Sequence, residues 1–435
     1  MTKDYTHFGI ENYILKISGV FNYTSTFYAT ALKNSYEPLV FSKSNVNFCK
    51  DFFYPNLRKE FFSNNNDRHP ILIRKGTANT PVNLFQYAYN STTEKAKSID
   101  IIVAESRLDL FENGFGMFSL SLRLTTDQLA LATFSDAAFL ARNFDTTIAY
   151  GSYTKWHEYI ENEVLLGLST RGSTIKVDEY SGSKYKLYMV LDVPQLEDKR
   201  QIKALLFDIG TLSRLGSAIG DASDGMDDTY IKKLIKNNSI EVFNNWQGLA
   251  LLDTYTVVGK SILSADWKKE TYGTIYFGIY YYCLFLKYSL FKFNFDIADL
   301  DEDRREDFQD FLAKYYFNYV SYNFLPTEIY NKIRAALDIE KELQLLNEKI
   351  VAVGQKIQEE QQDRTNKILG IVTVLSSLSS AQPVYDYLII GQKILGWNVA
   401  VYWTITISIV LLLLGGVAFY VFGKNILKWI KKRKK

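Results

Sequence analysis

The sequence predicts a mixed α/β N-terminal domain, a long stalk helix and a two-helix transmembrane hairpin. Three observations support this fold class. The mean hydropathy of −0.11 is typical of a chain that is mostly water-soluble, so the strongly apolar residues must be concentrated in local segments. Apolar residues repeat at helical spacing after residue 327, and the uncharged run Ile394–Gly423 lies close to the C-terminus. The net charge of +2 is too small to attract nucleic acid electrostatically over the whole chain, and we expect no direct nucleic-acid partner.

Residues 1–265 are expected to form an α/β sensor domain in the cytoplasm. The N-terminus has no apolar run typical of a signal peptide, and the two cysteines, Cys49 and Cys283, form no disulfide framework. Alternating or β-branched runs predict strands at 101–104, 116–124, 184–191, 204–207 and 249–258. Residues 127–142 and 153–168 are expected to be helical.

A glycine- and aspartate-rich stretch, 210–228, is the best loop candidate in this domain. It matches neither the dinucleotide nor the P-loop fingerprint, which need a set glycine spacing after a strand. A mobile surface loop is the simpler interpretation. The alternative is a lid over a small-molecule site, with Gly210, Gly216, Gly220 and Asp221 as candidate ligand-loop residues.

Residues 266–326 form an aromatic-rich helical connector in this interpretation. The segment Tyr272–Leu286 is uncharged and contains seven Tyr or Phe residues. It is shorter than the roughly 20 residues that span a bilayer. A buried helix is therefore favoured over a third membrane span.

Residues 327–367 are expected to be a stalk helix that continues without a proline as far as Gln382. Its apolar residues alternate steps of four and three, which is the heptad spacing of a coiled coil. They are Ile339, Leu343, Leu346, Ile350, Val353 and Ile357. A stalk in an oligomer and a helix packed against its own domain are both compatible with this spacing.

Residues 368–423 are expected to be the transmembrane hairpin, followed by a basic cytoplasmic tail at 424–435. The second span is the more apolar. The first carries small and polar residues on one face, which either pack against other helices or line a pore in an oligomer. The pore-lining candidates are Asn366, Gly370, Thr373, Ser377 and Ser380.

This layout resembles the CorA-like family of two-transmembrane cation channels and transporters. The resemblance covers about residues 327–435: a stalk helix that becomes a membrane span, a short outer loop, a second span and a basic tail. Members of that family are pentamers and carry a Gly-Met-Asn motif at the outer end of the first span. Here the nearest match is Gly396-Trp397-Asn398, which makes Gly396 and Asn398 the filter-like residues.

The resemblance implies a homo-oligomeric cation channel or transporter gated by its cytoplasmic domain, with Mg²⁺ or another divalent cation as its ion. It implies a multi-pass protein of the inner (plasma) membrane, in contact with lipid and with both termini cytoplasmic. The alternatives are an antiviral-defence membrane effector of the type III CRISPR kind, activated by a small nucleotide messenger, and a non-conducting scaffold. No nucleophile elbow or phosphate loop is present, so we expect no enzyme.

Overall fold

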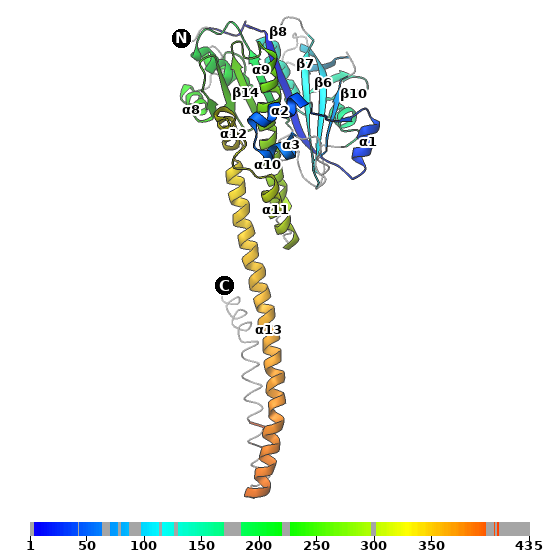
Figure 1. Cartoon of the computed structure of the whole chain (residues 1–435), viewed down its shortest axis with the longest axis vertical. Coiled ribbons are helices and arrows are strands. Elements are labelled where there is room, and N and C mark those ends of the chain that lie inside the picture. Colours follow the sequence, from blue (N-terminus) through cyan, green and yellow to red (C-terminus); the bar gives the residue numbers. More distant parts are fainter. Residues whose placement is uncertain are drawn as a thin grey trace, which may run out of the picture. The chain divides into compact units, whose positions relative to one another are not determined.

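The computed structural model describes residues 4–41, 43–62, 70–76, 80–86, 97–112, 115–125, 129–168, 184–219, 227–296 and 302–396, together with 404, 407 and 408. The chain forms two compact units, Met1–Leu346 and Asn347–Lys435. The first unit is mixed α/β and is built on one large sheet (Figure 1).

Within the described residues, this sheet has twelve strands, and its main path runs β10-β9-β5-β6-β7-β2-β11-β14-β13-β12. Strands β3 and β4 extend it beside β6, and β1 (Gly9–Ile10) pairs separately with β8 (Leu129–Ala130). Among the described strands, only β11 and β14 pair in parallel. The strands of the large sheet are β2 (Asn12–Asn22), β3 (Glu37–Pro38), β4 (Ile71–Lys75), β5 (Val82–Gln86), β6 (Lys97–Leu110), β7 (Phe115–Leu124), β9 (Thr147–Tyr150), β10 (Tyr153–Lys155), β11 (Lys186–Asp192), β12 (Ser239–Ile240), β13 (Trp246–Ala250) and β14 (Thr254–Gly259).

The two faces of the sheet differ in chemistry. Leu187, Met189 and Leu191 of β11 join the main apolar core with α4 (Leu131–Arg142) and α7 (Lys199–Thr211). Tyr188 lies between them in sequence, so it points to the opposite face. There its ring contacts Phe277 and Tyr280 of α10 (Phe277–Asp296), which crosses that face (Figure 1).

Shorter helices complete the first unit. The π-helix η3 runs directly into α10, and another π-helix, η1, follows α5. The remaining helices are α1 (Phe27–Lys33), α2 (Lys43–Phe52), α3 (Pro55–Phe61), α5 (Trp156–Tyr159), η1 (Ile160–Val164), η2 (Ser217–Ile219), α8 (Asp228–Asn238), α9 (Asp266–Glu270), η3 (Thr271–Tyr276), α11 (Glu302–Tyr315) and α12 (Phe324–Ala336).

Several element predictions agree with this fold and others are wrong. The single strand expected at 249–258 is instead the antiparallel pair β13 and β14, with a break at 251–253. Residues 101–104 lie in β6, 116–124 in β7 and most of 184–191 in β11, and the aromatic segment Tyr272–Leu286 is a buried helix. Residues 204–207 form part of α7 instead of a strand. Asp198 caps this helix by accepting hydrogen bonds from the N–H groups of Arg200 and Gln201. The buried residues Ile202, Leu205, Leu206 and Ile209 follow the spacing of one helical face.

The expected uninterrupted stalk is also wrong at its start. The helix breaks between α12 and α13 (Ile339–Leu395), where Asp338 has a left-handed backbone with φ of 54°. Ile339 and Leu346 of the heptad seam are fully buried. Both belong to the first unit, so the packed-helix interpretation holds for the beginning of α13. From Asn347 the same helix continues in the second unit, and it runs through Pro383.

The transmembrane hairpin is not supported. Among the described residues, no helix combines the length and apolarity that crossing a membrane requires. The first expected span lies within α13, whose Ile368, Ile371 and Val372 are more than half exposed. The second expected span lies almost wholly outside the described residues. This finding overturns the membrane part of the fold class and the multi-pass membrane location.

One glycine gives a direct test of the sheet. A Cβ added at Gly259 would lie 2.4 Å from Trp246 Cβ and 2.6 Å from the Asn245 carbonyl oxygen, where backbone and Cβ atoms cannot move aside cheaply. We expect Gly259→Ala to lower the free energy of unfolding by about 1–3 kcal/mol in urea titrations. Gly273→Ala is the matched control, since its Cβ would meet only Ile14 Cδ1 at 3.9 Å. Equal stability of the two variants would contradict the packing at the β13–β14 edge.

Candidate functional site

Charged and hydroxyl side chains line the sheet face that α10 crosses. The register places Lys16 opposite Ser121, Ser121 opposite Glu105, and Glu105 opposite Lys75. Residues directly opposite each other share a face. These four residues therefore form one row across β2, β7, β6 and β4.

A second polar row lies beside the first. It consists of Ser18, Ser119 and Arg107, which are paired in the same way. Asp109 follows Arg107 on the same face of β6, and Arg123 follows Ser121 on the same face of β7. We call these residues the polar strip: Lys16, Ser18, Lys75, Glu105, Arg107, Asp109, Ser119, Ser121 and Arg123.

The buried end of the strip is an ion pair covered by α10. The Arg107 guanidinium donates two hydrogen bonds to Asp109, from Nε at 2.7 Å and from Nη2 at 2.8 Å. The Tyr281 hydroxyl donates a third to Asp109 over 3.0 Å. The Asp109 side chain is fully buried, and the Arg107 side chain is 14% exposed. These three hydrogen bonds satisfy a buried carboxylate, and the one from Tyr281 ties α10 to the sheet.

Lys16 differs from Arg107 in the strip, because it is half-buried without an ion-pair partner among the described residues. Its Nζ lies 4.1 Å from the centre of the Phe277 ring, and it donates one long hydrogen bond of 3.5 Å to the Gly273 carbonyl oxygen. Within the described residues, no carboxylate lies within ion-pair distance of it. Burial lowers the pKa of Lys16 to about 8, with the charge of Glu105 opposing the shift and that of Arg107 adding to it. Lys16 is therefore a half-buried amine that is partly neutral near physiological pH.

The π-helix η3 supplies the carbonyl groups that meet these side chains. The Tyr188 hydroxyl donates to the Tyr272 carbonyl oxygen over 2.6 Å, and Lys16 reaches the next carbonyl, that of Gly273. A π-helix frees backbone groups from the usual α-helical pattern and occurs often at functional sites. The sheet thus holds η3 by side chain to backbone hydrogen bonds and the start of α10 by ring packing.

The structure describes the first part of the candidate ligand loop, as far as residue 219. Gly210 lies inside α7, where it packs against Leu249, while Gly220 and Asp221 lie outside the described residues. Gly216 has φ of 87°, a turn that favours glycine. Its N–H donates to Asp208, which also accepts from the Ala218 N–H and the Tyr5 hydroxyl. The start of the loop therefore wraps around a buried carboxylate of its own chain.

The pore-lining and filter-like candidates are distributed along α13 and just beyond it. Asn366 and Thr373 are exposed, and the Thr373 hydroxyl donates to the Leu369 carbonyl oxygen of the preceding turn. Gly370 is buried, and the side chains of Ser377 and Ser380 are outside the description. Gly396 follows the last residue of α13 with φ of 61°, the left-handed conformation common after a helix end. Asn398 lies outside the described residues.

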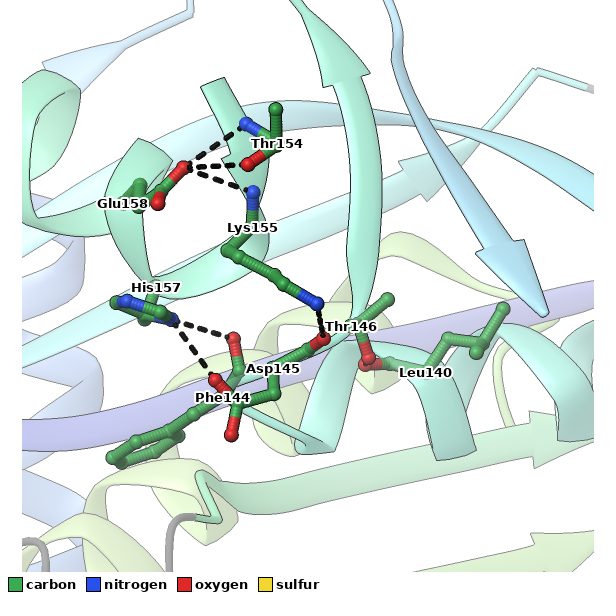
Figure 2. Close-up of polar contacts among 8 residues, drawn as sticks. All are labelled: Leu140, Phe144, Asp145, Thr146, Thr154, Lys155, His157 and Glu158. Carbon is green, nitrogen blue, oxygen red and sulfur yellow. Dashed lines mark hydrogen bonds and ion pairs between the residues drawn. The ribbon is translucent and has the colours of Figure 1, made fainter. Parts of the chain in front are cut away.

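The two histidines that the structure describes, His7 and His157, make separate local contacts. Figure 2 shows the surroundings of His157, whose Nδ1 lies 3.0 Å from the Phe144 carbonyl oxygen and 3.6 Å from the Asp145 carboxylate. Next to it, Glu158 accepts hydrogen bonds from the N–H groups of Thr154 and Lys155, which caps α5. These contacts explain local structure. His7 lies 3.8 Å from the exposed Asp4, and His69 is outside the described residues.

No outside comparison adds to this picture. Comparison with protein families, with curated proteins and with solved structures finds no match to the chain. The resemblance to CorA-like channels therefore stays a prediction. In the part of the chain that the structure describes, no group of three or more His, Cys, Asp or Glu residues could hold a metal ion.

The sequence did contain a signal for the polar strip. In β6, Glu105, Arg107 and Asp109 occupy every second position, and residues between them are buried on the other face. Such alternation indicates a strand with one charged face. Sequence reasoning alone would leave that face in water, because nothing in the strand tells which helix covers it.

The buried Asp208 generates a pH prediction. Burial raises the pKa of Asp208 from 3.8 to about 6, against the lowering effect of its hydrogen-bond donors. The folded state therefore holds this proton to higher pH than the unfolded chain does. The resulting stabilisation is full below about pH 4 and is lost as the pH rises through about 6.

We expect the stability difference between the native protein and Asp208→Asn to change by on the order of 2 kcal/mol across that window. Thermal and urea unfolding followed by tryptophan fluorescence at pH 4 to 7 would measure it. The exposed Asp266→Asn is the control. A native-minus-Asp208→Asn difference that is flat with pH would contradict the raised pKa.

Proposed function

We propose that this chain is a ligand-responsive protein that assembles through its long helix. A small anionic ligand binds at the polar strip, and α10 transmits its binding to the start of α13. The observation that carries the proposal is that α10 contacts the polar strip at its start and the first turn of α13 near its middle, through Lys287. Nucleotides are the first ligand class to test.

The charge of the strip favours an anion. It holds four cationic and two anionic side chains, a net charge of +2. Arg107 is already paired with Asp109, whereas Lys16 has no acidic partner among the described residues. Phosphate and carboxylate oxygens are the natural partners of such cations. Phe277 offers an aromatic ring beside Lys16.

α10 provides the physical connection to the stalk. Phe277 and Tyr281 contact the strip in its first two turns. Further along, the Tyr282 ring stacks on Tyr330 of α12 with centroids 6.0 Å apart. Lys287 Nζ then pairs with Glu342 of α13 over 3.0 Å. A ligand that draws Lys16 away from Phe277 would change the packing of α10 and so alter the restraint on α13.

The junction between α12 and α13 can act as a hinge. Asp338 is in the left-handed conformation at the break, so a small rotation there reorients the whole of α13. Arg334 and Tyr316 both contact Glu340 just beyond the break, which holds the hinge in one position. Movement of α10 would act on this clamp through Lys287 and Glu342.

Self-association is proposed from the exposed apolar side chains of α13. Val351, Ile368, Leu369, Ile371 and Val372 are all more than half exposed. Ile368, Ile371 and Val372 are spaced three and four residues apart, so they share one face. A helix with 57 residues is about 85 Å long and needs a cover for such a face. The same face of a second copy of this chain meets that need, because identical helices match in length and spacing.

The first experiment tests assembly. We expect light scattering of the full chain to give a mass of several copies, with five as the number that the CorA-like resemblance implies. Ile371→Glu should shift the mass toward the monomer, because it places a charge in the apolar contact. Gln361→Glu, an exposed polar position of the same helix, should leave the mass unchanged. A monomeric native chain would refute self-association.

The second experiment tests ligand response. A thermal-shift screen with mono-, di- and cyclic nucleotides, and separately with Mg²⁺, should find stabilisation by at least one nucleotide. Saturation at 100 times Kd corresponds to about 2.7 kcal/mol. Lys16→Met should remove the shift, and the exposed Lys33→Met should keep it. Stabilisation by Mg²⁺ alone, or a nucleotide shift that survives Lys16→Met, would count against the strip as the anion site.

A further inference from the structure

We infer that Lys16 is a modification site for carbon dioxide, whose adduct would be a lysine carbamate held by the polar strip. The inference goes beyond the proposed function, because it concerns a covalent change at Lys16 and needs neither a nucleotide nor assembly. It rests on the placement of Lys16 among the charged rows of β4, β6 and β7.

The environment of Lys16 keeps its amine reactive. Nζ lies over the Phe277 ring and makes one long hydrogen bond to the Gly273 carbonyl oxygen. Within the described part of the chain it has no carboxylate partner, so no ion pair must be broken to expose its lone pair. With the pKa of Lys16 at about 8, a substantial fraction of the amine is neutral in mildly alkaline buffer.

The reaction balances without a further reagent. The lone pair of the neutral amine attacks the carbon of CO₂, and a C–N bond forms as one C=O π bond becomes a carboxylate. The nitrogen then loses one proton to solvent. The product is N-carboxylysine, which carries one negative charge. No oxidant or reductant takes part.

The charge of the strip matches the product. Lys75, Arg107 and Arg123 remain as cations, while Glu105 and Asp109 remain as anions. Conversion of Lys16 from a cation to an anion therefore changes the net charge of the strip from +2 to zero. Ser121, directly opposite Lys16, is a hydroxyl donor for the new carboxylate. CO₂ is small enough to reach a half-buried amine where a larger acyl donor would need a cavity.

The test is chemical trapping on the full chain. The protein would be equilibrated with ¹³C-bicarbonate near pH 8, alkylated with triethyloxonium to fix carbamates, digested and analysed by mass spectrometry. We expect the heavy ethoxycarbonyl group on Lys16, and far less on the exposed Lys33 of the same sample. Lys16→Met should lose that signal, provided that its circular dichroism matches the native protein.

Arg123→Gln is a second test, which applies even if Lys16→Met does not fold. Arg123 is exposed, so Arg123→Gln should leave the fold intact and lower the labelled fraction of Lys16 about threefold. Labelling of Lys16 no greater than that of Lys33 would overturn the inference. Undiminished labelling in Arg123→Gln would also overturn it. Either result leaves the thermal-shift test of nucleotide binding unaffected.

Discussion

The packing of α10 against a charged face of the sheet is the constraint on which the rest of the first unit depends. Burying Arg107 and Asp109 costs a large desolvation energy, and the cost is offset only when every donor and acceptor is well placed. The two hydrogen bonds within the pair and the one from Tyr281 supply that placement. α10 is therefore positioned by polar contacts, and its aromatic residues fill the space around them.

This constraint explains the composition of α10. Its segment 277–286 carries no charge, and all its residues except Gly278 are buried, because it packs on the sheet on one side and on α3 and α12 on others. Gly278 lets Phe62, the residue that follows α3, approach closely, since a Cβ at position 278 would meet the Phe62 ring at 2.5 Å. An uncharged aromatic helix that is enclosed by protein and a helix that is inserted in a membrane both appear in the sequence as an uncharged apolar run. Its short length and its high aromatic content both favoured the correct interpretation, a buried helix.

Local patterns predicted much of the fold, and long-range contacts account for what they missed. Strand β7 and the segment 101–104 of β6 were predicted from their own local pattern, whereas the rest of β6 was not. The run 204–207 was not, since four apolar residues fit a strand or a helix face, and only Asp198 and the wider spacing of Ile202 and Ile209 decide for the helix. The break at Asp338 could not be predicted, because no glycine or proline lies beside it in the sequence. The environment of Lys16 could not be predicted from the sequence, because it depends on which helix covers β2 and on how far the nearest carboxylates lie from Nζ.

Both proposals depend on the excess positive charge of the polar strip, and they exclude each other at Lys16. An anionic ligand and a carbamate both correct the same imbalance, and both would act at Lys16. They cannot act together, because a carbamate at Lys16 repels the anion that the amine would attract. Since Phe277 rests against Lys16 at the start of α10, either event changes the support of the helix that holds Glu342 through Lys287. Lys16 of β2, which packs against the start of α10, would therefore carry either proposed input to the first turn of α13, as a cation with the bound ligand and as an anion in the carbamate.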